Sequence, residues 1–342
     1  MARDEMSVAV QAIDEIHDVG ARGLFEHVGQ FDHPVVFRGL ARDWPLVRRA
    51  RESASAAVEY LKGFDSGQPV TAYIGASETA GRIFYNEDVT DTNFSQAGIE
   101  LGRVLDQLLE HADDPQPPTI YVGSSAIDLC LPGLGAENSL PRGSHRASVR
   151  IWIGNRTIVA AHYDAMENIA CVCAGQRRFT LFPPEQLANL YVGPMELTPA
   201  GQQISMVDLN DPDLERYPRF SEALKHARSA VLEPGDAIYI PCMWWHHVQG
   251  LDPFNILINH WWRELPDYMG APNDALLHAI LNIRDLPQSQ RAAWRHLFDH
   301  YVFNADPDHV EHIPEHSRGV LGTLGEDQAR RLRAFLRNKL NR

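Results

Sequence analysis

The stretch TIVAAHYD, residues 157–164, places an apolar run directly before His162 and Asp164. Side chains on a β-strand alternate between its two faces, so His162 and Asp164 are expected on the same face. A carboxylate in an otherwise apolar strand is costly unless it is paired or binds a metal. An imidazole and a carboxylate on a rigid strand supply two of the three ligands of a facial metal site. The stretch therefore predicts a metal centre in preference to a hydrogen-bonded structural histidine.

The third ligand is expected from a distant strand. The segment PCMWWHHV, residues 241–248, contains His246 and His247, and His246 is the first candidate. Adjacent residues on a regular strand point in opposite directions, so only one of the two histidines can face the interior. The residues by themselves leave this choice open.

Residues 148–262 have the pattern of short strands separated by turns. Val149, Ile151 and Ile153 are spaced two apart, as on a strand with one buried face. The segment EPGD, residues 233–236, has the proline and the glycine of a type II turn. Many short strands with turn signals at this spacing predict a β-sandwich or a jelly-roll barrel.

Helical patterns flank this region on both sides. The expected helices lie at residues 7–30, about 45–62, 101–111, 272–303 and 323–340. The apolar faces of the last two helices must be buried against the barrel or against a second subunit. We therefore expect a mainly β protein with helical extensions, divided into an N-terminal α+β region (1–117), a barrel core (118–265) and a C-terminal helical region (266–342).

The composition limits the classes of function. The chain has 342 residues, of which 44% are hydrophobic and 22% charged, as in ordinary soluble globular proteins. Its formal net charge is −14 and no basic stripe is evident, which argues against a DNA partner. No apolar run approaches the ~20 residues that cross a bilayer, and the N-terminus lacks the apolar core of a secretory signal. The four cysteines have no disulfide-type spacing, so we expect reduced thiols and a cytoplasmic location.

Other polar residues in this region are candidates for ligand binding. An inward-facing Arg177 offers a planar fork that matches a carboxylate, whereas Arg178 is expected to be a solvated strand residue. Asn259 lies in an apolar strand, where a buried amide needs a partner from the backbone or from a ligand. Tyr121 is either a core residue or a hydroxyl donor to a ligand. The remaining aromatic residues are expected in the barrel core and rim: Trp244, Trp245, Trp261 and Trp262.

Residues 118–262 resemble the JmjC/cupin-like Fe(II)- and 2-oxoglutarate-dependent oxygenases. They are most similar to the group typified by the asparaginyl hydroxylase that inhibits hypoxia-inducible factor. The motifs that carry the resemblance are HYD (162–164), GQRRFTLFPP (175–184), PGD (234–236), IPCMWWHH (240–247) and NHW (259–261). Residues 34–45 and 211–220 also look like parts of that group.

The resemblance implies a role for each matching residue. His162, Asp164 and His246 match the iron triad, which settles the choice between the adjacent histidines. The remaining matches are the expected 2-oxoglutarate-binding residues Arg177, Tyr121, Asn168 and Asn259. Arg177 stands where the asparaginyl hydroxylase has a lysine that binds the distal carboxylate of 2-oxoglutarate. Val159 is a departure, because that hydroxylase has a threonine hydroxyl facing the co-substrate at this position.

The family fold is a double-stranded β-helix, or jelly roll, and its reaction couples oxidative decarboxylation of 2-oxoglutarate to hydroxylation of a substrate. The resemblance implies a protein or peptide substrate, and a homodimer formed through the C-terminal helices. N-methyl-lysine demethylation, or hydroxylation of a small molecule or a tRNA base, are the alternatives within the family. A non-enzymatic metal-binding cupin is an alternative of another class, and Arg177 counts against it. A zinc or manganese cupin isomerase is disfavoured by the absence of a His-x-His pair.

Overall fold

The computed structural model describes residues 10–20, 24–141, 146–199, 201–266 and 268–340. The chain divides into two compact units, Met1–Arg263 and Glu264–Arg342. The finer division of the first unit at residue 117 stays a prediction, because strands from both sides of this position belong to the same sheet.

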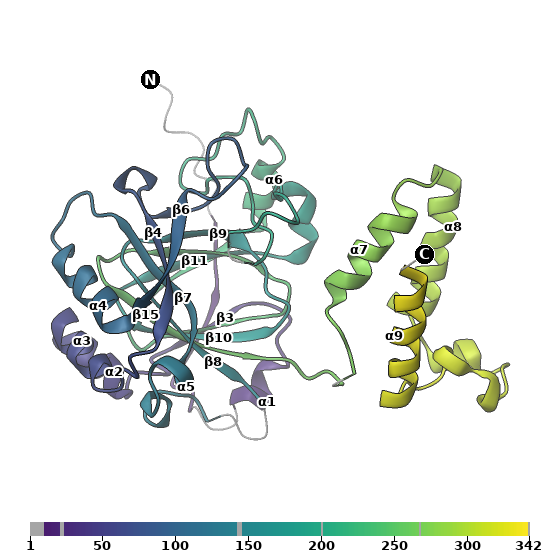
Figure 1. The fold of residues 1–342 in the computed structure, drawn as a ribbon, viewed down its shortest axis with the longest axis horizontal. Helices are drawn as coiled ribbons and strands as arrows, with labels where there is room; N and C mark the ends of the chain where they lie inside the picture. The colour runs from purple at the N-terminus through teal and green to yellow at the C-terminus, as the bar shows by residue number, and fades with distance from the viewer. Residues whose placement is uncertain (1–9, 21–23, 142–145, 200, 267, 341–342) are drawn as a thin grey trace. The chain divides into compact units, whose positions relative to one another are not determined.

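The first unit contains two β-sheets (Figure 1). In spatial order, the smaller sheet consists of β1 (Gln11–Ala12), β12 (Arg228–Leu232), β11 (Arg177–Phe182), β14 (Trp245–Gly250), β9 (Ile158–His162) and β5 (Arg82–Ile83). The larger sheet consists of β2 (Asp14–His17), β3 (Val35–Arg38), β13 (Ala237–Ile240), β10 (Glu167–Ala174), β15 (Asn255–Trp262), β8 (Ser148–Gly154), β7 (Thr119–Ala126), β4 (Pro69–Gly75) and β6 (Phe94–Glu100). The predicted mainly β fold of the jelly-roll type is confirmed.

The two faces of the larger sheet have different tasks. On one face, alternate residues of its central strands are fully buried in the main hydrophobic core, among them Ile151, Ile169 and Ile258. On the other face, the intervening residues line a cavity, among them Asn168 and Asn259. This arrangement follows from the two-residue period of a strand. Each central strand therefore contributes to the core and to the cavity at once.

Helices cover the core face of the larger sheet (Figure 1). They are α2 (Pro45–Glu52), α3 (Ala54–Lys62), α4 (Leu101–Glu110) and the short α5 (Ile127–Cys130). The amphipathic helix expected at 101–111 is confirmed as α4, whose Leu101, Val104, Leu105 and Leu108 are buried. The single helix expected at about 45–62 is two helices. Ser53 has an extended backbone between them and caps α3 by accepting a hydrogen bond from the Ala56 amide.

The helical lead-in expected at residues 7–30 is wrong for most of its described part. Residues 10–17 contain β1 and β2, and only α1 (Leu24–Val28) is helical; residues 7–9 and 21–23 lie outside the described residues. β1 pairs in parallel with β12, and β2 pairs in parallel with β3. Pairing with the two sheets provides hydrogen-bond partners for the backbone of β1 and β2. Ile13, the residue between β1 and β2 in the chain, is buried.

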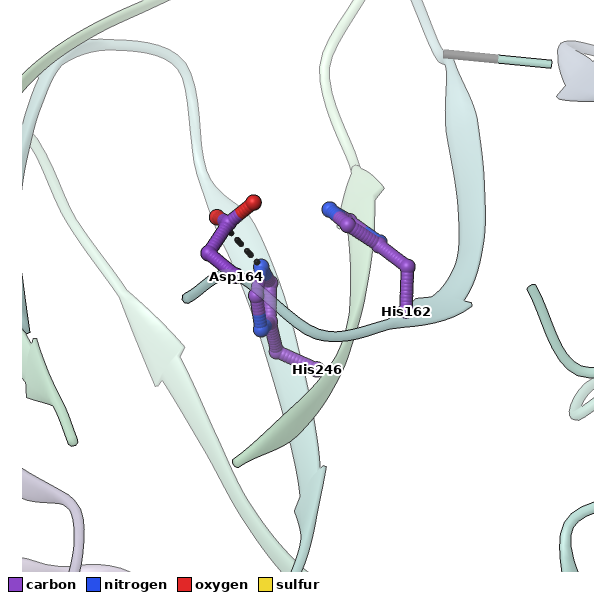
Figure 2. Close-up of side chains that lie close together, drawn as sticks. All are labelled: His162, Asp164 and His246. Atoms are coloured by element: carbon purple, nitrogen blue, oxygen red, sulfur yellow. Dashed lines mark ion pairs between the residues drawn. The ribbon is translucent and has the colours of Figure 1, made fainter. Parts of the chain in front are cut away.

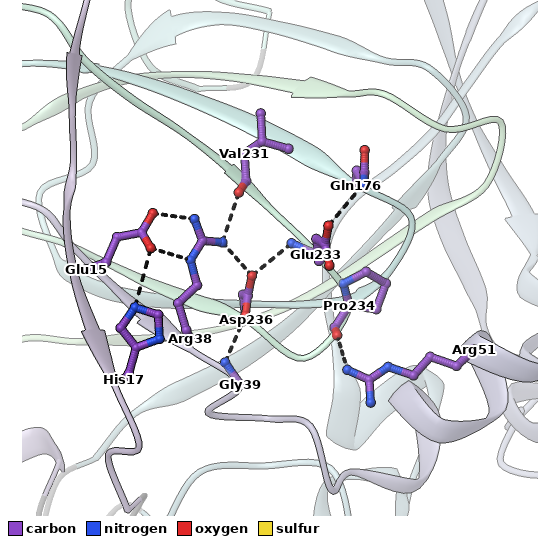
Figure 3. Close-up of polar contacts among 10 residues, drawn as sticks. All are labelled: Glu15, His17, Arg38, Gly39, Arg51, Gln176, Val231, Glu233, Pro234 and Asp236. Atoms are coloured by element: carbon purple, nitrogen blue, oxygen red, sulfur yellow. Dashed lines mark hydrogen bonds and ion pairs between the residues drawn. The ribbon is translucent and has the colours of Figure 1, made fainter.

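A polar network fixes the N-terminal strands to the barrel (Figure 3). Arg38 at the end of β3 donates to Glu15 of β2 and, at 2.6 Å, to the Asp236 carboxylate. Asp236 also accepts from the Gly39 amide at 2.8 Å. The turn predicted at 233–236 is confirmed, because the Asp236 amide donates to the Glu233 carbonyl at 2.9 Å and Gly235 has φ +104°. The loop before β13 is thereby held in place.

The second unit is helical. It contains α7 (Pro272–Ile283), α8 (Gln288–Phe298), a π-helical turn (Asp299–Phe303) and α9 (Glu326–Leu340). Large apolar side chains are exposed along these helices: Leu276, Leu277, Leu281, Trp294, Leu297, Tyr301, Phe335, Leu336 and Leu340. In the part of the chain that is described, no helix is both long enough and apolar enough to cross a membrane.

Candidate metal centre

His162, Asp164 and His246 lie close together at one end of the smaller sheet. β9 ends at His162, so Asp164 belongs to the following loop rather than to the strand. His246 is the second residue of β14, and it pairs with His162 across the two strands. The three side chains point toward one another (Figure 2), and one ligand atom from each lies within 4.8 Å of the others. The expected ligand set is therefore brought together from two neighbouring strands and the loop that follows β9.

Backbone carbonyls orient both histidines. The Nδ1 of His162 is 2.9 Å from the carbonyl oxygen of Ala160, and the Nδ1 of His246 is 3.0 Å from that of Trp244. Each carbonyl can only accept, so each Nδ1 carries the proton and Nε2 has the free lone pair. Metal-binding histidines commonly have such a partner on the second ring nitrogen.

The electrostatics favour the protonation states that a metal requires. Burial, reinforced by the neighbouring His246, lowers the pKa of His162 to about 4, so its imidazole is neutral at pH 7. Burial by itself would raise the pKa of Asp164, but the neighbouring His246 and His162 lower it overall. Two neutral imidazoles and one carboxylate are the ligands of facial iron(II) sites. The donor set therefore fits iron(II).

His246 and His247 have different surroundings. His246 lines the cavity beside Asp164, with 3.5 Å between its Nε2 and the carboxylate oxygen. His247 is also buried, but it does not line the cavity. Burial lowers the pKa of His247 to about 4 as well. The structure thus places His246 in the position that the family resemblance implies.

A cavity of about 360 Å³ opens beside the three ligands. Arg177, Tyr121, Asn168 and Asn259 line it together with the triad, so every residue expected in the site faces one space. Their functions stay predictions. Val159 lines the same cavity, where its side chain offers no hydroxyl.

Arg177 is a buried cation without a countercharge. Its side chain is 3% exposed, and among the described residues no carboxylate pairs with it. Its Nη2 is 3.5 Å from the Trp152 carbonyl, and its Nε has no partner. Burial lowers the pKa of Arg177, and the neighbouring Tyr121 offsets this only in part. An anion bound in the cavity would supply the missing countercharge. Arg178, by contrast, is exposed as predicted.

Trp152 contacts Asn259 and Tyr121, and Asn259 in turn contacts Asn168. The Trp152 indole Nε1 donates to Asn259 Oδ1 at 2.8 Å, and Asn259 Nδ2 donates to Asn168 Oδ1 at 3.1 Å. Tyr121 stacks on Trp152, with 6.1 Å between the ring centroids. Burial raises the pKa of Tyr121 to about 12, so its hydroxyl remains a donor.

Sequence reasoning missed several lining residues. Trp152, Tyr73, Met166 and Gln202 all face the cavity. For Trp152 a signal existed, because it lies between Ile151 and Ile153 and so faces away from the core. Trp261, expected in core or rim, also lines the cavity, while Trp244, Trp245 and Trp262 are buried.

Comparison with known proteins points to one family. A family model described as a cupin-like domain matches residues 22–268. HSPB1-associated protein 1 of Rattus norvegicus is 32% identical over 276 residues, which cover 75% of this chain and 54% of that protein. Lysine-specific demethylase 8 of Xenopus tropicalis is 22% identical over 252 residues, which cover 73% of this chain and 53% of that protein.

A third relative matches a shorter region. The tRNA wybutosine-synthesizing protein 5 of Danio rerio is 35% identical over 105 residues, which cover 31% of this chain and 29% of that protein. The chain thus spans about a quarter to a half of the length of the curated relatives it matches.

Proposed function

The chain belongs to the cupin-like domain family, and from that premise we propose that it is an iron(II)- and 2-oxoglutarate-dependent oxygenase that hydroxylates a protein side chain. Its resemblance to the JmjC/cupin oxygenases is confirmed by relatives that include a lysine-specific demethylase and a tRNA-modifying protein. The observation that carries the proposal is the pairing of the His162–Asp164–His246 cluster with the buried, uncompensated Arg177 in one cavity.

Each residue has a task in this proposal. His162, Asp164 and His246 hold iron(II), which, when bound, activates oxygen at the expense of 2-oxoglutarate. Arg177 binds the distal carboxylate of 2-oxoglutarate as a charge-assisted fork, with the Tyr121 hydroxyl as a second donor. The apolar and aromatic lining excludes water, which strengthens these interactions.

The charges in the cavity favour a neutral substrate side chain. Among the described lining residues, Asp164 and Arg177 are the only Asp, Glu, Lys or Arg, and Asp164 is already assigned to the metal. A methylated lysine would find no carboxylate to compensate its charge and would depend on the aromatic rings of the lining. Hydroxylation of an uncharged side chain is therefore preferred to demethylation. The names of the relatives keep demethylation and tRNA modification as the alternatives to test.

The test is an anaerobic titration with iron(II) and 2-oxoglutarate. We expect a weak visible charge-transfer band that appears only when iron(II) and 2-oxoglutarate are both present. This band should be lost in His162→Ala. Iron binding without any such band would overturn it and favour a metal-binding cupin. Aerobic assays with peptides then separate the reactions, because hydroxylation adds one oxygen atom to the peptide and demethylation releases formaldehyde.

We also propose that the second unit forms a homodimer. The support is the set of exposed apolar side chains on α7, α8 and α9, which includes Leu281 at 73% exposure. Light scattering of the full chain should give a dimer, and deletion of residues 323–342 should give monomer or insoluble protein. A monomeric full chain would refute this proposal.

A cytoplasmic location is proposed on the basis of the cysteines. All four are free thiols, and Cys130, Cys171 and Cys173 are buried. Growth of cells that express a fluorescent fusion, followed by fractionation, tests the location directly.

A further inference from the structure

Trp152, on β8, contacts three of the four residues that we expect to bind 2-oxoglutarate. Its carbonyl accepts from Arg177 Nη2 at 3.5 Å, and its ring stacks on Tyr121. Its indole N–H donates to Asn259 Oδ1 at 2.8 Å. None of these contacts was expected from the sequence. Together they place Trp152 among the residues that we expect to bind 2-oxoglutarate.

The indole determines how the neighbouring amides are oriented. An indole nitrogen can only donate, so the bond from Trp152 requires Asn259 to present its Oδ1 to the ring. Asn259 Nδ2 then faces Asn168 and donates to Asn168 Oδ1 at 3.1 Å. Because its oxygen accepts from Asn259, the Nδ2 of Asn168 is the donor that this residue offers to a ligand in the cavity that it lines.

This orientation is not fixed by the shape of the amides themselves. The oxygen and the nitrogen of a carboxamide are nearly equal in size, so packing alone distinguishes poorly between the two flipped states. Asn259 and Asn168 are 1% and 5% exposed, so bulk water does not compete for these bonds. The three residues lie on β8, β15 and β10, which are adjacent strands of one sheet. The donor-only indole is therefore the group that selects one state.

We propose that Trp152 is a positioning residue that, through Asn259, holds the Asn168 amide as a hydrogen-bond donor toward 2-oxoglutarate. This inference rests on the proposed function. The carboxylate and keto oxygens of 2-oxoglutarate are all acceptors at neutral pH, so they are attracted by Asn168 Nδ2. If the pair flipped, Asn168 would present Oδ1 and repel the same oxygens.

The first test is Trp152→Phe, which keeps an aromatic ring and removes the N–H. The dissociation constant of 2-oxoglutarate, measured anaerobically with the iron(II) protein, should rise roughly tenfold to hundredfold, the size of one charge-assisted hydrogen bond. The affinity for Mn(II) in the absence of 2-oxoglutarate should not change, because the hydrogen bonds and ring contacts described for Trp152 involve none of His162, Asp164 and His246. Trp44→Phe is the matched control, because Trp44 is buried in the core and does not line the cavity.

A double-mutant cycle with Asn168→Ala separates positioning from packing. If Trp152 acts through the Asn168 amide, Trp152→Phe should add no further loss of 2-oxoglutarate affinity in the Asn168→Ala background. Two losses that simply add would show that Trp152 contributes by packing and would overturn the inference.

The outcomes distinguish this inference from the proposed function. A wild-type protein that does not bind 2-oxoglutarate overturns the proposed function itself. A wild-type protein that binds it, with unchanged affinity in Trp152→Phe, overturns only the role of Trp152. If Trp152→Phe does not fold, Asn259→Leu is the second test. This variant removes the hydrogen bond from Asn259 to Asn168 and keeps the indole ring of Trp152. Unchanged affinity in Asn259→Leu then overturns the inference.

Discussion

Replacing Arg177 by methionine should change stability and ligand binding in opposite directions. Arg177 is 3% exposed and has no carboxylate partner among the described residues. Methionine retains an unbranched apolar side chain and removes the buried charge. Replacing buried ionic groups by apolar residues commonly stabilises proteins by about 1–4 kcal/mol, so we expect Arg177→Met to raise the free energy of unfolding without ligand by roughly 1–3 kcal/mol.

The same substitution should nearly abolish 2-oxoglutarate binding. Two charge-assisted hydrogen bonds from the guanidinium are worth about 1.5–3 kcal/mol each. Their loss corresponds to an affinity lower by roughly 10² to 10⁴-fold, at about 1.4 kcal/mol per factor of ten. A ligand present at 100 times its dissociation constant stabilises the native state by about 2.7 kcal/mol, and the variant should lose this gain.

Urea unfolding with Mn(II), in the presence and absence of 2-oxoglutarate, measures both effects. The matched control is Arg178→Met on the same strand, where the side chain is exposed. Arg178→Met should leave the stability within about 0.5 kcal/mol and retain the stabilisation by 2-oxoglutarate. If Arg177→Met were destabilised without ligand, or were still stabilised by 2-oxoglutarate, the reasoning about an uncompensated anion-binding cation would be refuted.

Three further predictions concern the metal and the scaffold. Asp164→Asn should lower metal affinity strongly while leaving the fold intact. Calorimetry with Mn(II) measures this affinity, and an unchanged value would mean that Asp164 is not a ligand. The metal-free protein should lose stability as the pH falls from about 6.5 toward 4. The pKa of His162 and that of His247 are lowered to about 4 in the native state. In this pH range the unfolded state therefore binds protons that the native state does not. The slope should reach about 1.4 kcal/mol per pH unit for each histidine, and equal urea midpoints at pH 7 and pH 5 would contradict it. Gly175→Ala should destabilise the protein by more than about 1 kcal/mol in urea unfolding, because Gly175 has φ +66° and an added Cβ would collide with Asn255. An unchanged urea midpoint would mean that this turn adjusts freely.

The clustering of His162, Asp164 and His246 could be predicted in part from local signals. His162 and Asp164 are two residues apart, and the apolar run before them marks a strand. Their approach to His246 depends on pairing between β9 and β14, which the residues alone left open and the family resemblance supplied. The alternating pattern around Ile151 likewise predicted β8 correctly.

The errors arose where partners are distant in the chain. β1 pairs with β12 across more than two hundred residues, with Gln11 opposite Arg228, so no local pattern reports the pairing. The polar residues of β2 read as the exposed side of a helix. The contact between Trp152 and Asn259 was missed for a related reason, because the two residues are 107 positions apart in the chain.

The way in which His162 and His246 are oriented has a consequence for how such a protein changes over evolutionary time. Each imidazole is aligned by the carbonyl two residues earlier in its own strand segment, at Ala160 and at Trp244. A carbonyl is present whatever side chain a residue carries, so this alignment survives substitutions at those positions. Substitutions elsewhere in the cavity wall can therefore change its shape and polarity while the backbone contacts that align the two imidazoles remain.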